Sequence, residues 1–366
     1  MTVSISPSAA SGAIGLRGAA PLVLLRSKSF MRLAVLGLGN MGATHLRALR
    51  DVPGAEVVAV YSSDERKLAG DFSALPGDQS GLIDFSAARP YRELDRAIAD
   101  PSAEAIDICL PTYLHDPVAV EALRGGKHVL VEKPMALDGF GADRMANAAR
   151  RYKKILMTAH VLRFSPEYVS LREALLDGQL GGLCFAVFQR WCPAPARGEW
   201  WRNAEKSGGG VFDLLIHDVD FCLHTFGKPK LVSATGHTSL DRGIDFLNAQ
   251  LHYENGGVVS ILGGWTEPGG CPFSADYRVV MDGGVIEYRA GACPPTLYTA
   301  ASSARPLGIA GGADGYRAEL QYFTVCCRTG TAPEACPPNE SVDAVKMMRL
   351  LLEARSRNAV KLLCRI

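Results

Sequence analysis

The sequence predicts an α/β protein in which a doubly wound parallel sheet comes first and an α+β domain with an open, mostly antiparallel sheet follows. Two observations predict this order. In residues 31–160, continuous apolar runs alternate with helical patterns, as is typical of buried parallel strands joined by crossover helices. In the second half, apolar runs flank Asn255-Gly256 and Asp282-Gly283, which are strong short-range signals of antiparallel hairpins.

Length and composition limit the class of protein. The chain has 366 residues, of which 48% are hydrophobic and 21% are charged, enough for two domains with cores of their own. The 39 basic and 38 acidic residues give a formal charge of +1, so no global field attracts nucleic acid or an anionic membrane. No apolar run is long enough to span a bilayer. Any charged ligand must therefore be bound by a local site.

The chain is expected to begin with a segment that the fold does not need. Residues 1–30 are small, polar and punctuated by glycine and proline, and we interpret them as a disordered extension or as a mis-assigned start before Met31. The ten cysteines are scattered and have no spacing suited to zinc. We therefore expect reduced thiols, no metal site and a cytoplasmic location.

A glycine turn follows the first predicted strand. Gly37, Gly39 and Gly42 form the pattern G-x-G-x-x-G, with Asn40 and Met41 inside it and a helical pattern directly after. The first glycine makes the tight turn, the second lets a pyrophosphate approach the backbone, and the third allows close packing of the helix. The helix N-terminus then faces the phosphates. Strand, turn and helix in this order predict dinucleotide binding.

The end of the second strand bears on which dinucleotide binds. An acidic residue there would bind the ribose 2'-hydroxyl of NAD. The sequence instead has Ser62 and Ser63, with Asp64 slightly late and Arg66 within reach of a phosphate. This favours NADP over NAD. The alternative is that Ser62 only caps a loop and that Asp64 turns in to bind NAD.

Polar residues follow two further strands at the edge where ligands of such sheets bind. Glu132 and Lys133 end the run VLVEKP, and Pro111 and Thr112 follow the preceding strand. Lys133 could exchange a proton with a substrate hydroxyl while a hydride moves to or from the nicotinamide, and Glu132 would steady the ammonium or the cofactor. The alternative is that Lys133 extends to water, as lysines usually do. His115 would approach the nicotinamide or cap the following helix.

Four motifs, in this order and spacing, resemble the glucose-fructose oxidoreductase, inositol dehydrogenase and rhizopine-catabolism family. They are GLGNMG at 37–42, PTYLH at 111–115, GKHVLVEKP at 126–134 and GGGVFDLLIHD at 208–218. The likeness runs from about residue 31 to the C-terminus. It implies a dinucleotide-binding Rossmann domain, residues 31–160, and a C-terminal domain, residues 161–366, that binds substrate and forms homodimers or homotetramers.

The resemblance also implies the catalytic residues. The family's E-K-P element matches residues 132–134, which makes Lys133 the expected catalytic lysine. Its D-x-x-x-H element matches Asp213 and His217, which are four apart and so share a helix face. In relatives with this pattern the histidine and the lysine share the acid–base work, and the aspartate contacts substrate hydroxyls or orients the histidine. Many relatives have Asn where Thr112 stands, and a hydroxyl offers a cofactor fewer hydrogen bonds than an amide.

Aromatic and basic residues near these motifs are candidates for substrate binding. Trp200, Trp201 and Arg202 precede the predicted Asp213 helix. Indole faces stack on sugar rings, and an arginine beside them could hold a carboxylate or phosphate. Arg163, directly after the last strand of the first domain, is a second candidate arginine. The alternative is that the tryptophans are core residues and the arginines are surface charges.

These observations predict an NAD(P)-dependent oxidoreductase that transfers a hydride between the nicotinamide and a secondary hydroxyl or ketone of a sugar, inositol or nucleotide-sugar. Lys133 and His217 would carry the proton. Two alternatives are a redox-neutral NAD-dependent glycosidase and a non-catalytic dinucleotide-binding sensor. The Gly/Pro-rich segments 266–275 and 290–315 are expected to be loops that could close over the site.

Overall fold

The computed structural model describes residues 30–75, 81–195, 199–267, 272–308, 314–357 and 359–366. Met31–Ile366 form one compact unit, and residues 1–29 of the expected extension lie outside the described residues. Two sheets organise this unit. The nine cysteines in the described ranges are free thiols, as predicted. Within these ranges no helix is long and apolar enough to cross a bilayer.

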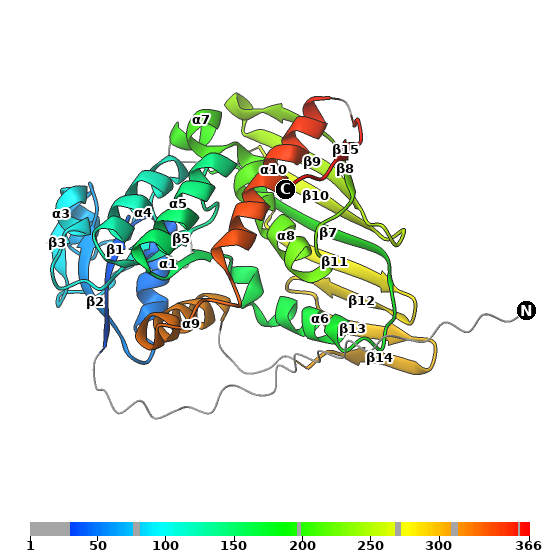
Figure 1. Cartoon of the computed structure of the whole chain (residues 1–366), viewed down its shortest axis with the longest axis horizontal. Coiled ribbons are helices and arrows are strands. Elements are labelled where there is room, and N and C mark those ends of the chain that lie inside the picture. Colours follow the sequence, from blue (N-terminus) through cyan, green and yellow to red (C-terminus); the bar gives the residue numbers. More distant parts are fainter. Residues whose placement is uncertain (1–29, 76–80, 196–198, 268–271, 309–313, 358) are drawn as a thin grey trace, which may run out of the picture. The chain divides into compact units, whose positions relative to one another are not determined.

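The first sheet is parallel, with the strand order β3-β2-β1-β4-β5-β6, so the predicted doubly wound sheet is confirmed (Figure 1). The chain order reverses between the neighbours β1 and β4, and ligands of such sheets bind beyond the strand ends at that point. The elements of this region are β1 (Met31–Leu36), α1 (Asn40–Leu49), β2 (Ala55–Tyr61), α2 (Glu65–Leu68), β3 (Arg89–Tyr91), α3 (Leu94–Ile98), β4 (Ala105–Ile108), η2 (Thr112–Leu114), α4 (His115–Arg124), β5 (His128–Glu132), α5 (Gly139–Tyr152) and β6 (Leu156–Ala159).

Apolar side chains cover both faces of this sheet, which explains the unbroken apolar runs in the sequence. Along β1, Leu33 and Val35 belong to one core cluster, while Ala34 and Leu36 belong to the other. The helix α9 (Gly315–Thr329) returns from late in the sequence and packs beside α1 (Figure 1). Local sequence patterns did not predict this return, because they carry no information on which helix covers which face.

The second sheet has the order β14-β13-β12-β11-β7-β10-β9-β8-β15. Only β7 and β10 are parallel neighbours among these described strands, so the predicted mostly antiparallel sheet is confirmed. Its helices α6, α8 and α10 pack on one face (Figure 1). The elements are η3 (Val161–Arg163), α6 (Pro166–Leu176), β7 (Leu183–Pro193), η4 (Glu199–Arg202), α7 (Ala204–Ser207), α8 (Gly210–Phe226), β8 (Leu231–Ser239), η5 (Leu240–Arg242), β9 (Ile244–His252), β10 (Val258–Thr266), β11 (Ser274–Met281), β12 (Gly284–Arg289), β13 (Cys293–Thr299), β14 (Ser302–Pro306), α10 (Pro338–Ser356) and β15 (Leu362–Leu363).

One prediction about this sheet is wrong. Within the segment 290–315, expected to be a loop, residues 293–299 and 302–306 form the strands β13 and β14. Prolines hid these strands, because proline cannot donate to a ladder and is confined to bulges and edges. Pro294 and Pro295 lie at a register shift between β12 and β13, and Pro306 lies on the edge strand β14. Residues 268–271 and 309–313, in the two expected loops, lie outside the described residues.

Candidate active site

The glycine turn lies between β1 and α1, and its geometry requires glycine. Gly37 has a φ of 98°, and a Cβ there would lie 2.5 Å from the carbonyl oxygen of Cys109. A Cβ on Gly42 would lie 2.0 Å from the carbonyl oxygen of Gly37. At Gly39, by contrast, no atom lies within 4 Å of the place of a Cβ. The turn therefore leaves open space at Gly39.

The N-terminus of α1 faces the same turn. Gly39 is its N-cap residue and has no side chain that could bond to the N–H groups of the first turn, which begins with Asn40 and Met41. These N–H groups, together with the open space, form the kind of site where backbone amides bind the phosphates of a dinucleotide.

The side chains at the end of β2 bond to one another. Ser62 is buried, and its hydroxyl accepts a hydrogen bond from the Asp64 amide (3.1 Å). The Asp64 carboxylate caps α2 by accepting a bond from the Arg66 amide (3.0 Å). The Arg66 guanidinium is exposed and donates to Asp71 (2.8 Å), and Ser63 is also exposed. Ser62 thus caps a loop, while Asp64 serves the helix.

Lys133 follows β5, and its ammonium reaches the helix that carries the predicted aspartate. Nζ lies 3.0 Å from Oδ1 of Asp213 and 3.0 Å from the Asp213 carbonyl oxygen. The side chains of the pair are 14% and 13% exposed, so both are largely shielded from water but open to a ligand. Within the described residues, the Asp213 carboxylate bonds to Lys133 and not to His217.

Two contacts that the sequence did not predict position α8. Its first residue packs so closely on Trp265 that a Cβ on Gly210 would lie 2.3 Å from the indole ring. Asp245, on β9, accepts a hydrogen bond from the Val211 amide (2.9 Å) and so caps the helix from a distant strand. The glycine run before α8 is therefore needed to place the helix, and with it Asp213.

His217 lies one helical turn after Asp213. Its Nδ1 is buried and has no hydrogen-bond partner among the described residues. Burial, together with the charges of Lys133 and Arg190 and the imidazole of His160, holds the pKa of His217 well below its ordinary value. This lowering favours the uncharged imidazole at neutral pH.

Buried polar groups that the sequence analysis missed surround this imidazole. Arg190, on β7, donates to both carboxylate oxygens of Asp218 (2.7 and 3.0 Å). His160, after β6, lies 3.4 Å from Asp220, and burial lowers its pKa to about 4. A usable signal was present, since Arg190 interrupts an apolar strand and the two aspartates interrupt an apolar helix. Fully buried charges are rare unless they are paired.

The prediction that Arg163 holds a substrate anion is wrong. Its guanidinium is buried and donates to both oxygens of Asp220 (2.7 and 2.8 Å) and to Glu340 (2.5 Å). These partners lie on α8 and α10, so the arginine joins the segment after β6 to two helices of the second sheet. Arg163 directly follows a strand, as ligand-binding residues often do. Its guanidinium is nevertheless bound by protein carboxylates from far along the chain.

The prediction that His115 approaches the nicotinamide or caps a helix also needs correction. The ring is buried, with Nδ1 2.8 Å from the Pro134 carbonyl and Nε2 2.7 Å from the Leu110 carbonyl. A neutral imidazole can donate to only one of them, and burial lowers the pKa of His115. The ring thus braces the segment after β4 against the turn after β5. Pro111 precedes η2, and the buried Thr112 begins it.

The two predicted substrate tryptophans stack on each other in η4. The ring centroids of Trp200 and Trp201 are 3.8 Å apart, and Trp201 meets Trp265 edge-on with centroids 5.7 Å apart. Trp201 therefore packs against a small core cluster around Trp265, and both members of the stack are partly exposed. Arg202 is exposed. Their contact with substrate stays a prediction.

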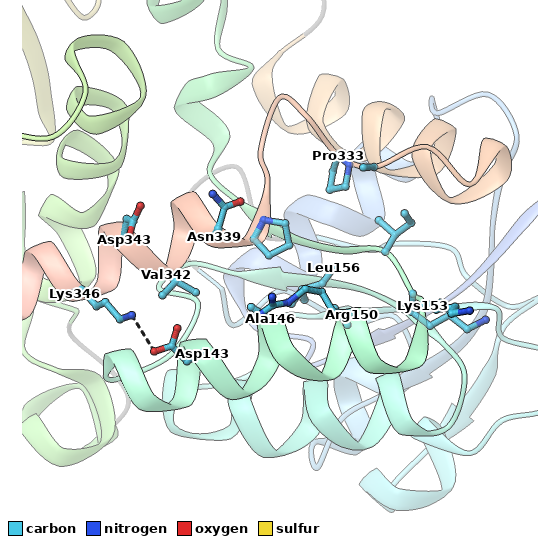
Figure 2. A pocket seen from close by; sticks show the side chains of 15 residues that line it. Asp143, Ala146, Arg150, Lys153, Leu156, Pro333, Asn339, Val342, Asp343 and Lys346 are labelled. Atoms are coloured by element: carbon cyan, nitrogen blue, oxygen red, sulfur yellow. Dashed lines mark ion pairs between the residues drawn. The ribbon is translucent and has the colours of Figure 1, made fainter. Parts of the chain in front are cut away.

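A groove of about 590 Å³ lies between α5 and α10 (Figure 2). Arg150 and Lys153, at the C-terminal end of α5, line one side, and Lys346 on α10 forms an ion pair across it with Asp143 (2.9 Å). The chain enters the N-terminal end of β6 from this groove. In a parallel sheet the N-terminal ends of the strands lie at the edge opposite the C-terminal ends, and Lys133 follows a C-terminal end. The groove is therefore separate from the candidate site.

Models of one family match both domains. The model described as "Oxidoreductase family, NAD-binding Rossmann fold" matches residues 31–160, and the model of the GFO/IDH/MocA C-terminal domain matches residues 168–287. The chain belongs to this family. The resemblance of the four motifs to GFO/IDH/MocA oxidoreductases is thereby confirmed, and so is the expected Rossmann fold.

Several relatives in the GFO/IDH/MocA family are named dehydrogenases. Myo-inositol 2-dehydrogenase of Thermotoga maritima is 28% identical over 215 residues, which are 58% of this chain and 60% of that protein's length. The scyllo-inositol 2-dehydrogenase (NAD(+)) of Bacillus subtilis is 27% identical over 317 residues, 83% of this chain and 88% of that protein. A solved structure of levoglucosan dehydrogenase, in complex with NADH and levoglucosan, has a TM-score of 0.80 at 16% identity and covers 92% of this chain and 100% of that chain.

The buried neutral imidazoles of this GFO/IDH/MocA protein predict a loss of stability in acid. The pKa of His160 is about 4 in the folded state, below the ordinary value near 6.5, so below pH 6.5 the unfolded chain binds a proton that the folded chain does not. Stability should therefore fall as the pH is lowered, by up to about 1.4 kcal/mol per pH unit for this one group. In His160→Gln, urea unfolding between pH 7 and pH 4.5 should show a shallower pH dependence.

The control for this measurement is Thr158→Val, which alters a buried side chain two residues before His160 that does not titrate. An equal pH dependence in His160→Gln and in the unmodified protein would contradict the expected behaviour of the buried ring.

Proposed function

We propose that the protein is an NAD(P)-dependent oxidoreductase that transfers a hydride between the nicotinamide and a secondary hydroxyl or ketone of a sugar, inositol or nucleotide-sugar. The observation that carries this proposal is the meeting of Lys133 and Asp213 at 3.0 Å, with His217 one turn further along the same helix. Lys133 follows a strand of the sheet that also carries the glycine turn. The names of the inositol dehydrogenase relatives support the substrate class.

The residues present fit a dinucleotide. The open space at Gly39 and the N-terminus of α1 would hold the pyrophosphate, beside Asn40 and Met41. Pro111 and Thr112, beyond β4, would border the nicotinamide half. The bound cofactor supplies the chemistry that these side chains lack, since the nicotinamide accepts or donates the hydride.

The side chains of the protein handle the proton. When a secondary alcohol is oxidised, its carbon gives up a hydride and its hydroxyl gives up a proton, so a base must lie beside the oxygen. His217 is uncharged at neutral pH and can accept a proton, whereas Lys133 can donate a hydrogen bond to the substrate oxygen and exchange a proton with it. Asp213 holds the ammonium in place. In the reverse direction the same groups return the proton to the oxygen of the ketone.

The stacked pair Trp200–Trp201 and the exposed Arg202 would bind the substrate. A partly exposed indole offers an apolar face to the C–H groups of a sugar ring, and a free guanidinium beside it suits a phosphate or carboxylate. A substrate with a sugar ring and a phosphate, such as a sugar phosphate or a nucleotide-sugar, would contact both the indole face and the guanidinium. A cytoplasmic location stays a prediction.

NADP is the expected cofactor. The nearest acidic side chains after β2 are already in use, because Asp64 caps α2 and Glu65 pairs with Arg92. At the end of β2, an acidic residue would repel the 2'-phosphate of NADP, and Ser62 and Ser63 occupy this place instead. Arg66 could exchange its exposed partner Asp71 for that phosphate, since an exposed ion pair contributes only about 0–1 kcal/mol.

Gly39→Ala should weaken cofactor binding without disturbing the fold. Its φ is −81°, and nothing lies within 4 Å of a new Cβ, so only an arriving phosphate would meet the added methyl group. We expect the Kd for reduced nicotinamide cofactor, measured by fluorescence titration, to rise by about tenfold or more. Gly308→Ala, at an equally open place, is the control. The same titration compares the two cofactors, and tighter binding of NADH than of NADPH would refute the NADP preference.

Lys133→Met should abolish turnover and leave cofactor binding. Methionine keeps an unbranched side chain one atom shorter but cannot exchange a proton, and loss of an acid–base group costs about 10²–10⁴ in rate. The assay is the absorbance of reduced nicotinamide with a panel of inositols, sugars, sugar phosphates and nucleotide-sugars. Lys154→Met, at the opposite edge of the sheet, is the control.

The outcome of this assay also separates the other functions. Cleavage of a glycoside without net reduction of the cofactor would indicate the redox-neutral glycosidase. Tight cofactor binding with no reaction on any substrate of either kind would favour the sensor.

The open face of the nine-stranded sheet is the expected interface between copies of the chain. The helices α6, α8 and α10 lie on one face only, and an apolar sheet face requires a cover. On the other face, Phe246 lies between His237 and Trp191, with centroid distances of 6.1 and 6.4 Å. Phe185, further along β7, is 41% exposed. These aromatic side chains on the face opposite the helices support a homodimer or homotetramer.

Phe185→Glu should shift the assembly toward single chains. Burying a carboxylate against another apolar sheet would cost several kcal/mol. Light scattering on the unmodified protein should give a mass of two or four chains, and a lower mass for the variant. Leu176→Glu, which alters an exposed leucine on α6, is the matched control. A single-chain mass for the unmodified protein at micromolar concentration would rule the interface out.

A further inference from the structure

A cluster of ionisable side chains lies buried beneath the candidate site, and the proposed reaction does not use it. His45 on α1, Asp107 on β4 and Glu319 on α9 have no exposed surface, and Glu132 at the end of β5 is 5% exposed. Four elements from both halves of the chain therefore bring charged groups to one place. Such groups are almost never fully buried unless they are paired, so each needs a partner within the cluster.

His45 joins two of the carboxylates. Its Nδ1 lies 3.1 and 2.9 Å from the two oxygens of Asp107, and its Nε2 lies 3.2 Å from Oε1 of Glu132. The second contact is at ion-pair distance without the alignment of a good hydrogen bond. Glu319 is further away, 3.9 Å from Nε2, and neither of its oxygens has a hydrogen-bond partner among the described residues.

The neighbours decide which of these groups is charged. Burial would lower the pKa of His45, but Asp107 and Cys109 beside it raise that pKa well above the ordinary value. Burial would raise the pKa of Glu132, but the neighbouring His45 and the charge of Lys133 lower it. Burial raises the pKa of Glu319 well above its ordinary value, so this acid is neutral. A positive His45 thus lies between two negative carboxylates.

Glu132 connects this cluster to the proposed catalytic lysine. Its Oε2 accepts a hydrogen bond from the backbone amide of Lys133 (2.9 Å), while Oε1 faces His45. The two oxygens of one carboxylate are therefore held from opposite sides. The Lys133 side chain then reaches Asp213. A continuous series of contacts leads from Asp107 through His45 and Glu132 to the site.

We propose that His45 is a positioning residue for the reaction: its ring holds the Glu132 carboxylate, which fixes the backbone of Lys133 so that the ammonium stays at Asp213. This inference rests on the proposed function, because it assigns a task to the lysine of that reaction. The expected effect is large, since a displacement of about 1 Å at a reacting group can cost about 10²-fold in rate. The raised pKa of Glu319 favours its neutral form, which adds no third negative charge beside the imidazolium.

The same side chains could also be considered as a metal site, because His45, Asp107 and Cys109 offer ligand atoms within 4.8 Å of one another. The geometry favours the ion pair. Nδ1, the nitrogen nearest the other two ligands, is already at hydrogen-bond distance from both oxygens of Asp107. A histidine that binds a metal must also be neutral, whereas Asp107 and Cys109 raise the pKa of this one.

Two substitutions of His45 separate its two contacts. The amide nitrogen of asparagine can take the place of Nδ1, so His45→Asn keeps a donor toward Asp107 and loses the contact with Glu132. The longer glutamine can take the place of Nε2, so His45→Gln keeps a donor toward Glu132 and loses Asp107. Both variants lose the charge and keep one contact, which makes them matched controls for each other.

We expect His45→Gln to retain at least ten times the kcat of His45→Asn. The KM for the sugar should differ by less than about threefold between the two variants, and so should the Kd for the cofactor. A second readout needs no substrate. The Lys133 amide, which donates to Glu132, should exchange its hydrogen at least ten times faster in His45→Asn than in His45→Gln, as measured by mass spectrometry of peptides that cover residues 128–137. If His45 had only a structural role, both substitutions would lower kcat and speed the exchange at Lys133 to the same extent.

Equal kcat values and equal exchange at Lys133 in the two variants would overturn the inference, as would a faster exchange in His45→Gln. If the unmodified protein reduces no cofactor with any substrate, the proposed function fails, but the exchange still decides whether His45 holds Lys133. Should either variant fail to fold, Glu132→Gln tests the series from its other end. The inference requires that it, too, speeds exchange at the Lys133 amide and lowers kcat at least tenfold, and an unchanged exchange rate would overturn it.

Discussion

The contact between Lys133 and Asp213 is the constraint on which the candidate site depends, because it joins the two sheets at the place where chemistry is expected. The lysine belongs to the ligand edge of the parallel sheet, and the aspartate belongs to a helix on the antiparallel sheet. Neither group can be moved independently of its own support. The backbone of Lys133 is held by the hydrogen bond from its amide to Glu132, and the helix α8 is held by the close packing of Gly210 on Trp265. The geometry of the site is thus a property of the whole unit rather than of either sheet.

The helix α8 carries two sets of polar side chains on its apolar body. Asp213 and His217 face the lysine, while Asp218 and Asp220 form buried ion pairs with arginines on β7 and after β6. Removal of one partner from such a pair typically costs about 3–5 kcal/mol. These pairs fix the rotation of the helix strongly. That support allows His217 to keep a buried nitrogen without a partner, an arrangement that would otherwise cost about 1–3 kcal/mol.

Local patterns predicted the parts of the structure that depend on local chemistry. The parallel strands, the two hairpins and the glycine turn follow from periodicity and turn residues, and the family motifs indicated Lys133, Asp213 and His217. The failures have a common cause. Arg163 and His115 were expected to bind ligands because they follow strands, but protein groups far away in the sequence already occupy them. Asp107 is a lone charge in the apolar strand β4, and such a charge is almost never fully buried without a partner.

His45 and His217 show how neighbours rather than depth decide what a buried histidine can do. Burial opposes the charge of both imidazoles. Around His45 the nearest charges are carboxylates, which face both ring nitrogens at 2.9 and 3.2 Å, and Asp107 helps to raise its pKa despite burial. Around His217 the nearest charges are Lys133 and Arg190, which act in the same direction as burial and keep the ring neutral. A charged ring with both nitrogens engaged can hold other groups but has no capacity to accept a proton. A neutral ring keeps one nitrogen lone pair, so the two environments suit His45 to the support of other groups and suit His217 to the acid–base role that we propose for it.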